Sequence, residues 1–275
     1  MPRCTGIAII DTNCLKFLES PDERRLVTAS LATADFDLWP TAINAVEAAK
    51  NKNQYVRDRV LAVLDALAEG KGLLPLPKQL LQRATNAIRD GYDAFSGPID
   101  LLRLKDRTSL TPEFCAAAQA WSDSLEERFN SMHDAARPKV QALIKAKPKQ
   151  APWATASTFL DQFWTTTSQQ DTLLQGFWES FGDSGQAPIE KMVAHPIWRM
   201  FLDLQGVAVF ERAIEHEQPK RVDCADLLQM LYLTLRPRRI LVTAEGPLFR
   251  AAKAVLDGRY SQAQVLTWED FRRNV

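Results

Sequence analysis

The stretch that decides the fold is "GIAIIDTNCLKFL", residues 6–18. Its run from Gly6 to Ile10 is short, apolar and β-branched, which is typical of a strand buried on both faces of a parallel sheet. The run stops at Asp11, and apolar residues resume in a segment, 13–20, that we expect to be helical. An acidic side chain therefore stands at the carboxyl end of a buried strand, the edge at which open α/β sheets bind their ligands.

Three further segments indicate that this strand belongs to an α/β sheet. The segment "FDLWPTAINAVEAAK" (36–50) predicts a second short strand, a break at Pro40 and a helix capped by Thr41. Residues 238–246, "RRILVTAEG", repeat the first pattern of an apolar strand, polar residues and a following helix, and residues 263–271 supply a last strand. Strands that alternate with helices at both ends of the chain predict a parallel sheet flanked by helices.

The middle of the chain has a different pattern. Residues 52–216 are expected to form a large all-helical insertion, so that residues 1–51 and 217–275 together build the α/β core. Within this insertion, Gly70 is expected to cap one helix at its C-terminus. The clearest helical stretches are residues 57–70, 109–137 (with Thr111 as N-cap) and 195–216, and residues 146–152 are expected to be a linker.

Composition excludes several classes of protein. The 275 residues carry 34 Lys plus Arg against 34 Asp plus Glu, so no global field attracts a polyanion and any nucleic-acid contact needs a local patch. The four cysteines form no C-x-x-C pair and the three histidines lie far from them, which argues against a zinc site. The N-terminus does not resemble a signal peptide and no run approaches membrane-spanning length, so we expect a reducing, cytoplasmic setting without a membrane partner.

Acidic residues form the most informative pattern. Asp11 and Glu245 each follow a predicted strand, while Asp223 and Asp226 open an amphipathic helix three residues apart and share one of its faces. Glu47 lies among Ala and Val residues, where a carboxylate is costly to desolvate. Like charges brought together repel one another, and a hard divalent cation such as Mg²⁺ or Mn²⁺ reverses the sign of that interaction. The sequence therefore predicts a site for such an ion that activates water against a phosphodiester.

These motifs also carry a family resemblance. The segments "IAIIDTNCLKFL", "WPTAINAVEAAK", "RVDCADLLQMLYL" and "ILVTAEGPLF" resemble the four ordered motifs of PIN-domain nucleases, over about the first 50 and last 60 residues. The resemblance implies a PIN-like sheet of strand order 3-2-1-4-5 and a ribonuclease that depends on Mg²⁺ or Mn²⁺. It assigns metal binding and catalysis to Asp11, Glu47, Asp226 and Glu245, and support to Asn13 and Thr243, with Asp223 as an alternative or auxiliary ligand. Glu245 departs from the family pattern, in which the last acid is often Asp.

Each pattern also has a simpler interpretation. Taken singly, the acids are ordinary helix caps, turn residues or surface groups. The aromatic residues Phe159, Phe163, Phe177 and Phe181 recur at helical spacing and predict core packing, with a partner surface or base stacking as alternatives. The histidines are expected to be structural or exposed. Basic residues near the acids either hold a phosphate backbone or form a solvated face: Lys220, Arg221, Arg236, Arg238, Arg239 and Arg250.

The functional hypothesis is a metal-dependent endoribonuclease that cleaves single-stranded or structured RNA. Two alternatives stay open at this point. One is a catalytically inactive PIN-like scaffold that binds a protein partner, or a second copy of itself, through the helical insertion. The other is the toxin of a toxin–antitoxin pair, which shares the chemistry and adds a protein inhibitor.

Overall fold

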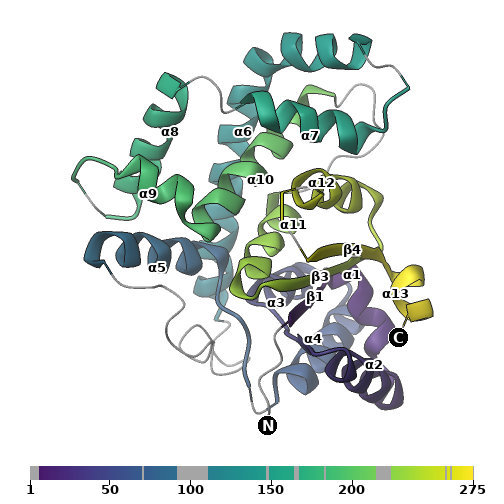
Figure 1. The fold of residues 1–275 in the computed structure, drawn as a ribbon. Helices are drawn as coiled ribbons and strands as arrows, with labels where there is room; N and C mark the ends of the chain where they lie inside the picture. Colours follow the sequence, from purple (N-terminus) through teal and green to yellow (C-terminus); the bar gives the residue numbers. More distant parts are fainter. Residues whose placement is uncertain are drawn as a thin grey trace.

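The computed structural model describes residues 6–69, 71–91, 111–146, 149–163, 167–182, 184–214, 224–257, 259–260 and 262–274. These residues form an α/β protein in which the sheet lies at one end and a group of long helices at the other (Figure 1). No helix in this part of the chain is long and apolar enough to cross a membrane.

The sheet has four parallel strands in the order β2-β1-β3-β4 (Figure 1). They are β1 (Gly6–Ile10), β2 (Phe36–Leu38), β3 (Arg238–Thr243) and β4 (Ala263–Thr267). The predicted parallel α/β sheet is thus confirmed, and its central strands come from opposite ends of the sequence. The order 3-2-1-4-5 requires one more strand on the outer side of β2, and the described residues contain no such strand. They contain instead one parallel bridge, between Thr41 and Leu74, just beyond β2 in sequence.

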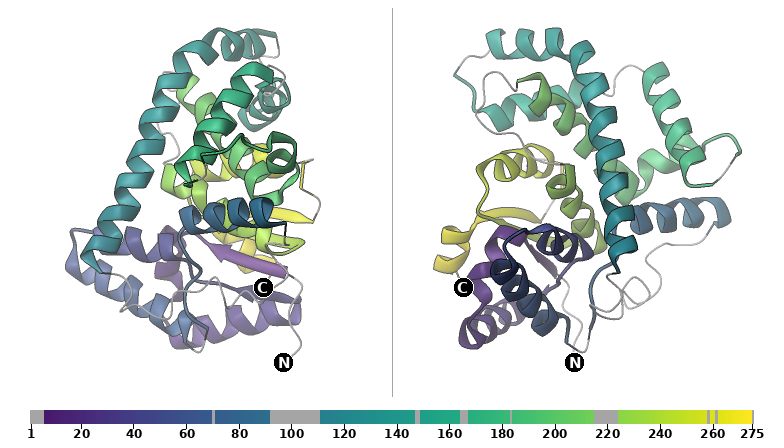
Figure 2. Two further views of the ribbon diagram at one scale, coloured as in Figure 1. Left: turned by 90° about the vertical axis from the view of Figure 1, so that its left-hand side faces the viewer. Right: turned by 180° about the vertical axis from the view of Figure 1, so that it is seen from behind.

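Alternation along β1 gives the sheet two buried faces. Ile7 and Ile9 belong to one hydrophobic cluster, and Ala8 and Ile10 to the other, because successive side chains of a strand point to opposite faces. The first face is covered by α10 (Pro196–Ala213) and α12 (Gly246–Leu256). The second is covered by α1 (Thr12–Leu15), α2 (Pro21–Thr33), α4 (Gln54–Ala68) and α13 (Trp268–Asn274). Figure 2 shows these layers from two further sides.

The described residues of the middle of the chain are mostly helical, as predicted, with a non-helical stretch at 71–76 that includes Leu74. Its further helices are α5 (Pro77–Asp90), α6 (Pro112–Ala146), α7 (Pro152–Phe163), α8 (Thr167–Ser180) and α9 (Ile189–Ala194). Helix α6 begins as expected, because the Thr111 hydroxyl accepts a hydrogen bond from the Phe114 N–H at 3.2 Å. The expected linker falls between α6 and α7. The boundaries of the insertion at residues 52 and 216 stay a prediction.

An aromatic cluster stabilises the helical part. The ring centroids of Phe177 and Phe201 lie 5.0 Å apart, and those of Phe181 and Trp198 lie 5.7 Å apart, both at steep interplanar angles that aromatic pairs favour. Phe159, Phe177 and Phe181 are buried, so their predicted core role is confirmed. The side chain of Phe163 lies outside the described residues.

The segment after β1 differs from the prediction. The helix predicted at 13–20 is instead a single α-helical turn, α1, followed by a 3₁₀ turn at Lys16–Leu18, and a separate helix α2 starts at Pro21. Proline disfavours helical backbone in the residue before it, which separates the two helices. Gly70, the expected C-cap, lies outside the described residues.

The close approach of β1 to β2 generates a stability prediction. A Cβ built at Gly6 overlaps the Phe36 ring and lies 2.9 Å from its Cγ. We expect Gly6→Ala to lower the free energy of unfolding by about 1–3 kcal/mol, since overpacking displaces side chains and backbone. Urea denaturation followed by circular dichroism measures the effect.

Gly176 in α8 is the matched control, because a Cβ there meets nothing within 4 Å. Gly176→Ala is expected to stabilise the protein by up to about 1 kcal/mol, since glycine is a poor helix former. A Gly6→Ala protein with the wild-type unfolding midpoint would contradict the close packing of β1 on Phe36.

Candidate metal centre

Asp11 is fixed at the carboxyl edge of the sheet by the backbone. Its N–H donates to the Val242 carbonyl at 2.9 Å, which continues the ladder between β1 and β3 by one residue. Its own carbonyl accepts from the Cys14 N–H at 2.9 Å as α1 begins. The side chain is fully buried. The opening carboxylate is therefore held inside the molecule at the end of the central strand.

Thr243 and Gln229 bind the Asp11 carboxylate directly. The Thr243 hydroxyl donates to Asp11 Oδ2 at 3.0 Å, and the Gln229 amide donates to Asp11 Oδ1 at 3.5 Å. The Thr243 oxygen also accepts from the Glu245 N–H at 2.9 Å. These bonds orient the carboxylate and agree with the supporting role that the sequence predicts for Thr243.

Three of the four predicted acids converge. Asp11, Glu47 and Asp226 each offer a carboxylate oxygen, and these oxygens lie within 4.8 Å of one another. Glu47 comes from α3 (Ala42–Lys50) and Asp226 from α11 (Cys224–Leu228), so three segments distant in the sequence meet at this point. We call these three residues the acidic cluster.

Helix α3 carries Glu47 to the cluster. The helix starts as predicted: the Thr41 hydroxyl accepts from the Asn44 N–H at 3.2 Å, and Asn44 Oδ1 accepts from the Thr41 N–H at 3.1 Å. This reciprocal cap sets where the helix begins and therefore which side of it Glu47 occupies. The Thr12 hydroxyl, next to Asp11 in sequence, donates to Glu47 Oε2.

Glu245 lies beside the acidic cluster and not within the group of three. Its Oε1 accepts from the Asn13 side-chain amide, and both residues are accessible to solvent. The predicted support from Asn13 is thus directed at Glu245. Asp223 lies outside the described residues, so its auxiliary role stays a prediction.

Sequence reasoning missed three polar residues around the cluster: Thr12, Asn44 and Gln229. The Asn44 side-chain amide donates to the Ile10 carbonyl at 3.2 Å and to the Thr12 hydroxyl at 3.0 Å. A signal was present, because Asn44 precedes Glu47 by three residues and Gln229 follows Asp226 by three, a spacing that places each pair on one helix face.

Burial sets the electrostatics of the cluster. Desolvation raises the pKa of Asp11 above its ordinary value, against the lowering effect of the hydrogen bonds from Thr243 and Gln229. Desolvation, with the charge of Asp11 added to it, raises the pKa of Glu47 to about 7. Glu47 therefore keeps its proton to a higher pH than an exposed glutamate does. Carboxylate oxygens that are poorly solvated and close together are suited to a hard cation such as Mg²⁺ or Mn²⁺.

Two of the basic residues predicted near the acids, Arg238 and Arg239, lie away from the acidic cluster. Arg238 and Arg239 begin β3, whereas Thr243 ends it, so the two arginines lie at the opposite edge of the sheet from the cluster. Arg238 pairs with Asp35 at 3.3 Å, and the Arg239 guanidinium lies 5.2 Å from the centre of the Tyr260 ring. The physical reason is that a strand is extended, so Arg238 and Thr243, at the two ends of β3, lie at opposite ends of the sheet's strands.

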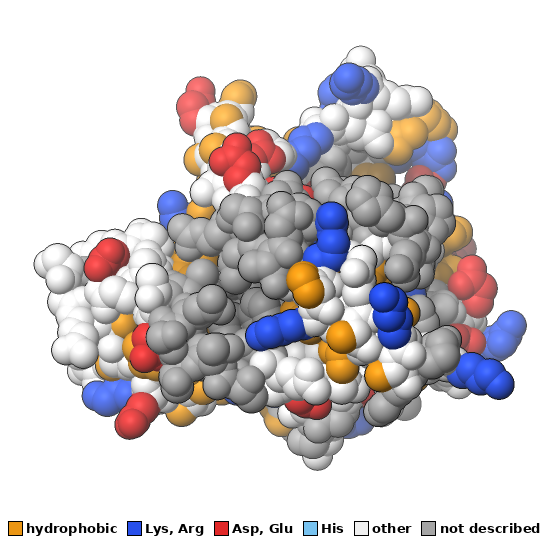
Figure 3. All heavy atoms as spheres, turned by 90° about the horizontal axis from the view of Figure 1, so that it is seen from above, with side chains coloured by type: hydrophobic (Ala, Val, Ile, Leu, Met, Phe, Trp, Pro, Cys, Tyr) orange, Lys and Arg blue, Asp and Glu red, His pale blue; other side chains and the backbone are white. Residues whose placement is uncertain are grey.

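Of the remaining predicted basic residues, Arg250 lies against an acidic partner. Arg250 Nη2 lies 3.7 Å from Glu211 Oε2, which turns part of its charge toward α10. Lys220 and Arg221 lie outside the described residues. On the face seen in Figure 3 the described Lys and Arg side chains stand apart from one another. His195, by contrast, has the predicted structural role, since its Nδ1 accepts from the Ile197 N–H at 3.3 Å and caps α10.

Comparison with protein-family models, with curated proteins and with solved structures finds no match to this chain. The PIN-like assignment therefore depends on the motifs and on the geometry of the acidic cluster.

The raised pKa of Glu47 generates a pH prediction for the metal-free protein. Between pH 4.5 and about 7 the folded protein holds a proton at Glu47 that the unfolded chain has lost. The contribution of this proton to the free energy of unfolding is therefore fully present below pH 4.5 and is lost as the pH rises through about 7. Glu47→Gln removes this dependence. Relative to wild type, we expect the variant to gain on the order of 1–3 kcal/mol of stability between pH 5 and pH 8.

Urea denaturation in EDTA at both pH values measures this difference. A gap between Glu47→Gln and wild type that is the same at pH 5 and pH 8 would show that Glu47 titrates in the folded protein as it does in the unfolded chain.

Proposed function

We propose that this protein is a metal-dependent phosphodiesterase that cleaves RNA through a PIN-like acidic site. The observation that supports this most is the convergence of Asp11, Glu47 and Asp226 from three separate segments, in the order and at the strand end that the motifs predict. Buried carboxylates placed together without a role are unfavourable, because each adds to the desolvation and repulsion of the others.

The sheet is compatible with this proposal. Its order β2-β1-β3-β4 corresponds to the 2-1-4-5 part of the order 3-2-1-4-5 that the resemblance implies. In this proposal the segment around Leu74, which bridges to Thr41, takes the place of the remaining strand.

Asp11, Glu47 and Asp226 would hold one Mg²⁺ or Mn²⁺ ion. Such an ion, when bound, activates water and stabilises the charge that develops on a phosphoryl oxygen. Thr243 and Gln229 fix the Asp11 carboxylate, and Thr12 fixes Glu47, so the ligand oxygens are oriented before the ion arrives.

Glu245 extends the negative charge toward solvent. Its carboxylate is held by Asn13 and is partly exposed, and its N–H donates to the Thr243 hydroxyl that binds Asp11. We assign it the role of positioning water or the substrate. This assignment keeps the four acids that the motifs predict but gives Glu245 a different place from the other three.

The test is loss of activity in Asp11→Asn, which preserves the shape of the side chain and removes its charge. We expect cleavage of single-stranded RNA in Mn²⁺ to fall by more than about 100-fold, because loss of even an outer-shell partner of a metal typically costs 10- to 100-fold. Calorimetric titration should show Mn²⁺ binding to wild type and none to the variant.

Asp203→Asn is the matched control. Asp203 is also a buried carboxylate, accepts a hydrogen bond from the Tyr260 hydroxyl at 3.0 Å and lies on α10 outside the acidic cluster. It should retain both cleavage and Mn²⁺ binding. Undiminished cleavage by Asp11→Asn would reject the assignment, and a wild-type protein that neither binds Mn²⁺ nor cleaves RNA would favour the inactive scaffold.

A further inference from the structure

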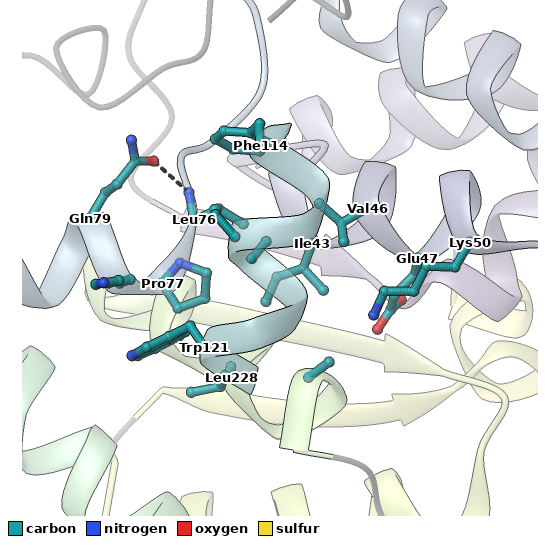
Figure 4. Close-up of a pocket in the computed structure, with 14 residues that line it drawn as sticks. Ile43, Val46, Glu47, Lys50, Leu76, Pro77, Gln79, Phe114, Trp121 and Leu228 are labelled. Carbon is teal, nitrogen blue, oxygen red and sulfur yellow. Dashed lines mark hydrogen bonds between the residues drawn. The ribbon is translucent and has the colours of Figure 1, made fainter. Parts of the chain in front are cut away.

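A pocket of about 220 Å³ opens beside the acidic cluster. It lies between α3, the start of α5, α6 and α11, and Glu47 belongs both to its wall and to the cluster. In Figure 4, Glu47 and Lys50 lie at one end of the pocket and Gln79 at the other. The pocket and the acidic cluster therefore share one residue, Glu47.

Two aromatic rings from α6 line the pocket. Phe114 and Trp121 are seven residues apart, which is two helical turns, so both face the same side, and both are partly accessible to solvent. Ile43, Val46 and Leu228 supply buried apolar surface next to them (Figure 4). The result is a largely apolar pocket with two partly exposed aromatic rings, and a flat ring can stack on such a side chain.

The rim of the pocket is basic. Lys50 and Lys78 line it and are exposed, and the charge of Lys50 acts on Glu47. Gln79, also at the rim, is fixed in position because its Oε1 accepts from the Leu76 N–H at 2.9 Å. Cations around an apolar slot complement a ligand that has a flat apolar body and anionic groups attached to it. A nucleotide has this chemistry, whereas an apolar peptide has no anionic group for the lysines.

We propose that this pocket binds an unpaired base of single-stranded RNA, stacked against Trp121, next to the phosphodiester that lies at the acidic cluster. Lys50 and Lys78 contact the adjoining phosphates. The proposal rests on the proposed function. It adds a reason why the substrate is single-stranded RNA, because a base within a duplex cannot enter the pocket. The helical segment, through α6, thereby contributes directly to substrate binding.

Fluorescence anisotropy with a labelled single-stranded oligoribonucleotide tests the pocket in proteins that carry Asp11→Asn to prevent cleavage. We expect Trp121→Ala to raise the dissociation constant about tenfold, within the range measured for loss of one base–aromatic stack. Trp121→Phe should restore most of the affinity, because a ring is again present. Placing an abasic residue at the position that enters the pocket should abolish the effect of Trp121→Ala.

Trp153 supplies the matched control, since it is another partly exposed tryptophan, on α7, with Lys253 Nζ 4.6 Å from the centre of its ring. Trp153→Ala should bind the oligonucleotide as the parent does. If Trp121→Ala fails to fold, Lys78→Ala replaces it. That variant should bind more weakly at low salt and reduce the slope of log affinity against log salt by about 1.

The outcomes separate the pocket from the activity. Equal affinity of the parent, Trp121→Ala and Lys78→Ala would overturn the pocket even if wild type cleaves RNA. Dependence of binding on Trp121 in a protein that neither binds Mn²⁺ nor hydrolyses RNA would leave the pocket supported and the proposed activity rejected. An apolar fluorescent dye that Trp121→Ala no longer binds, but that the oligonucleotide does not displace, would also overturn the proposal in favour of an apolar ligand.

Discussion

The convergence of three carboxylates, one fully buried and two partly buried, is the constraint on which the rest of this structure depends. Asp11, Glu47 and Asp226 bring their oxygens within 4.8 Å of one another, and desolvation raises the pKa of Asp11 and of Glu47. Without a cation or bound protons the arrangement opposes folding. Three polar groups reduce that cost by donating hydrogen bonds to the carboxylates: the Thr12 and Thr243 hydroxyls and the Gln229 amide. The Asn44 amide in turn donates to the Thr12 hydroxyl. In the proposed function a divalent cation offsets the remaining repulsion between the carboxylates.

The fold meets this constraint by joining distant parts of the chain. Pairing of β1 with β3 places Asp11 next to Thr243 at one edge of the sheet, while α3 and α11 bring the other two acids to that edge. The same helices form one side of the pocket, and α6 forms another. The acidic cluster and the pocket therefore share Glu47, which links the proposed chemistry to the proposed recognition of a base.

The sequence predicted the parts of this site that depend on local pattern. The apolar run before Asp11 indicated a buried strand, and the Thr41 cap indicated where the helix of Glu47 begins. Features that depend on tertiary structure were missed: Gln229 becomes a partner of Asp11 only when the 3₁₀ segment Gln229–Leu235, which follows α11, packs against the sheet. The predicted position of the β3 arginines was wrong for a related reason. Arg238 is close to Thr243 in sequence, but the two residues lie at opposite ends of the strand. The pocket needs α6 to lie against α3, and no pattern within either helix predicts that.

The central claim is that the acidic cluster is a binding site for one divalent cation. A crystal structure of the protein grown with Mn²⁺, with anomalous diffraction data collected above the manganese edge, tests it most directly. The account predicts an anomalous peak between the carboxylates of Asp11, Glu47 and Asp226, and no such peak in crystals of Asp11→Asn. Crystals with Mn²⁺ present but no peak at the cluster, or with these three side chains turned away from one another, would contradict it.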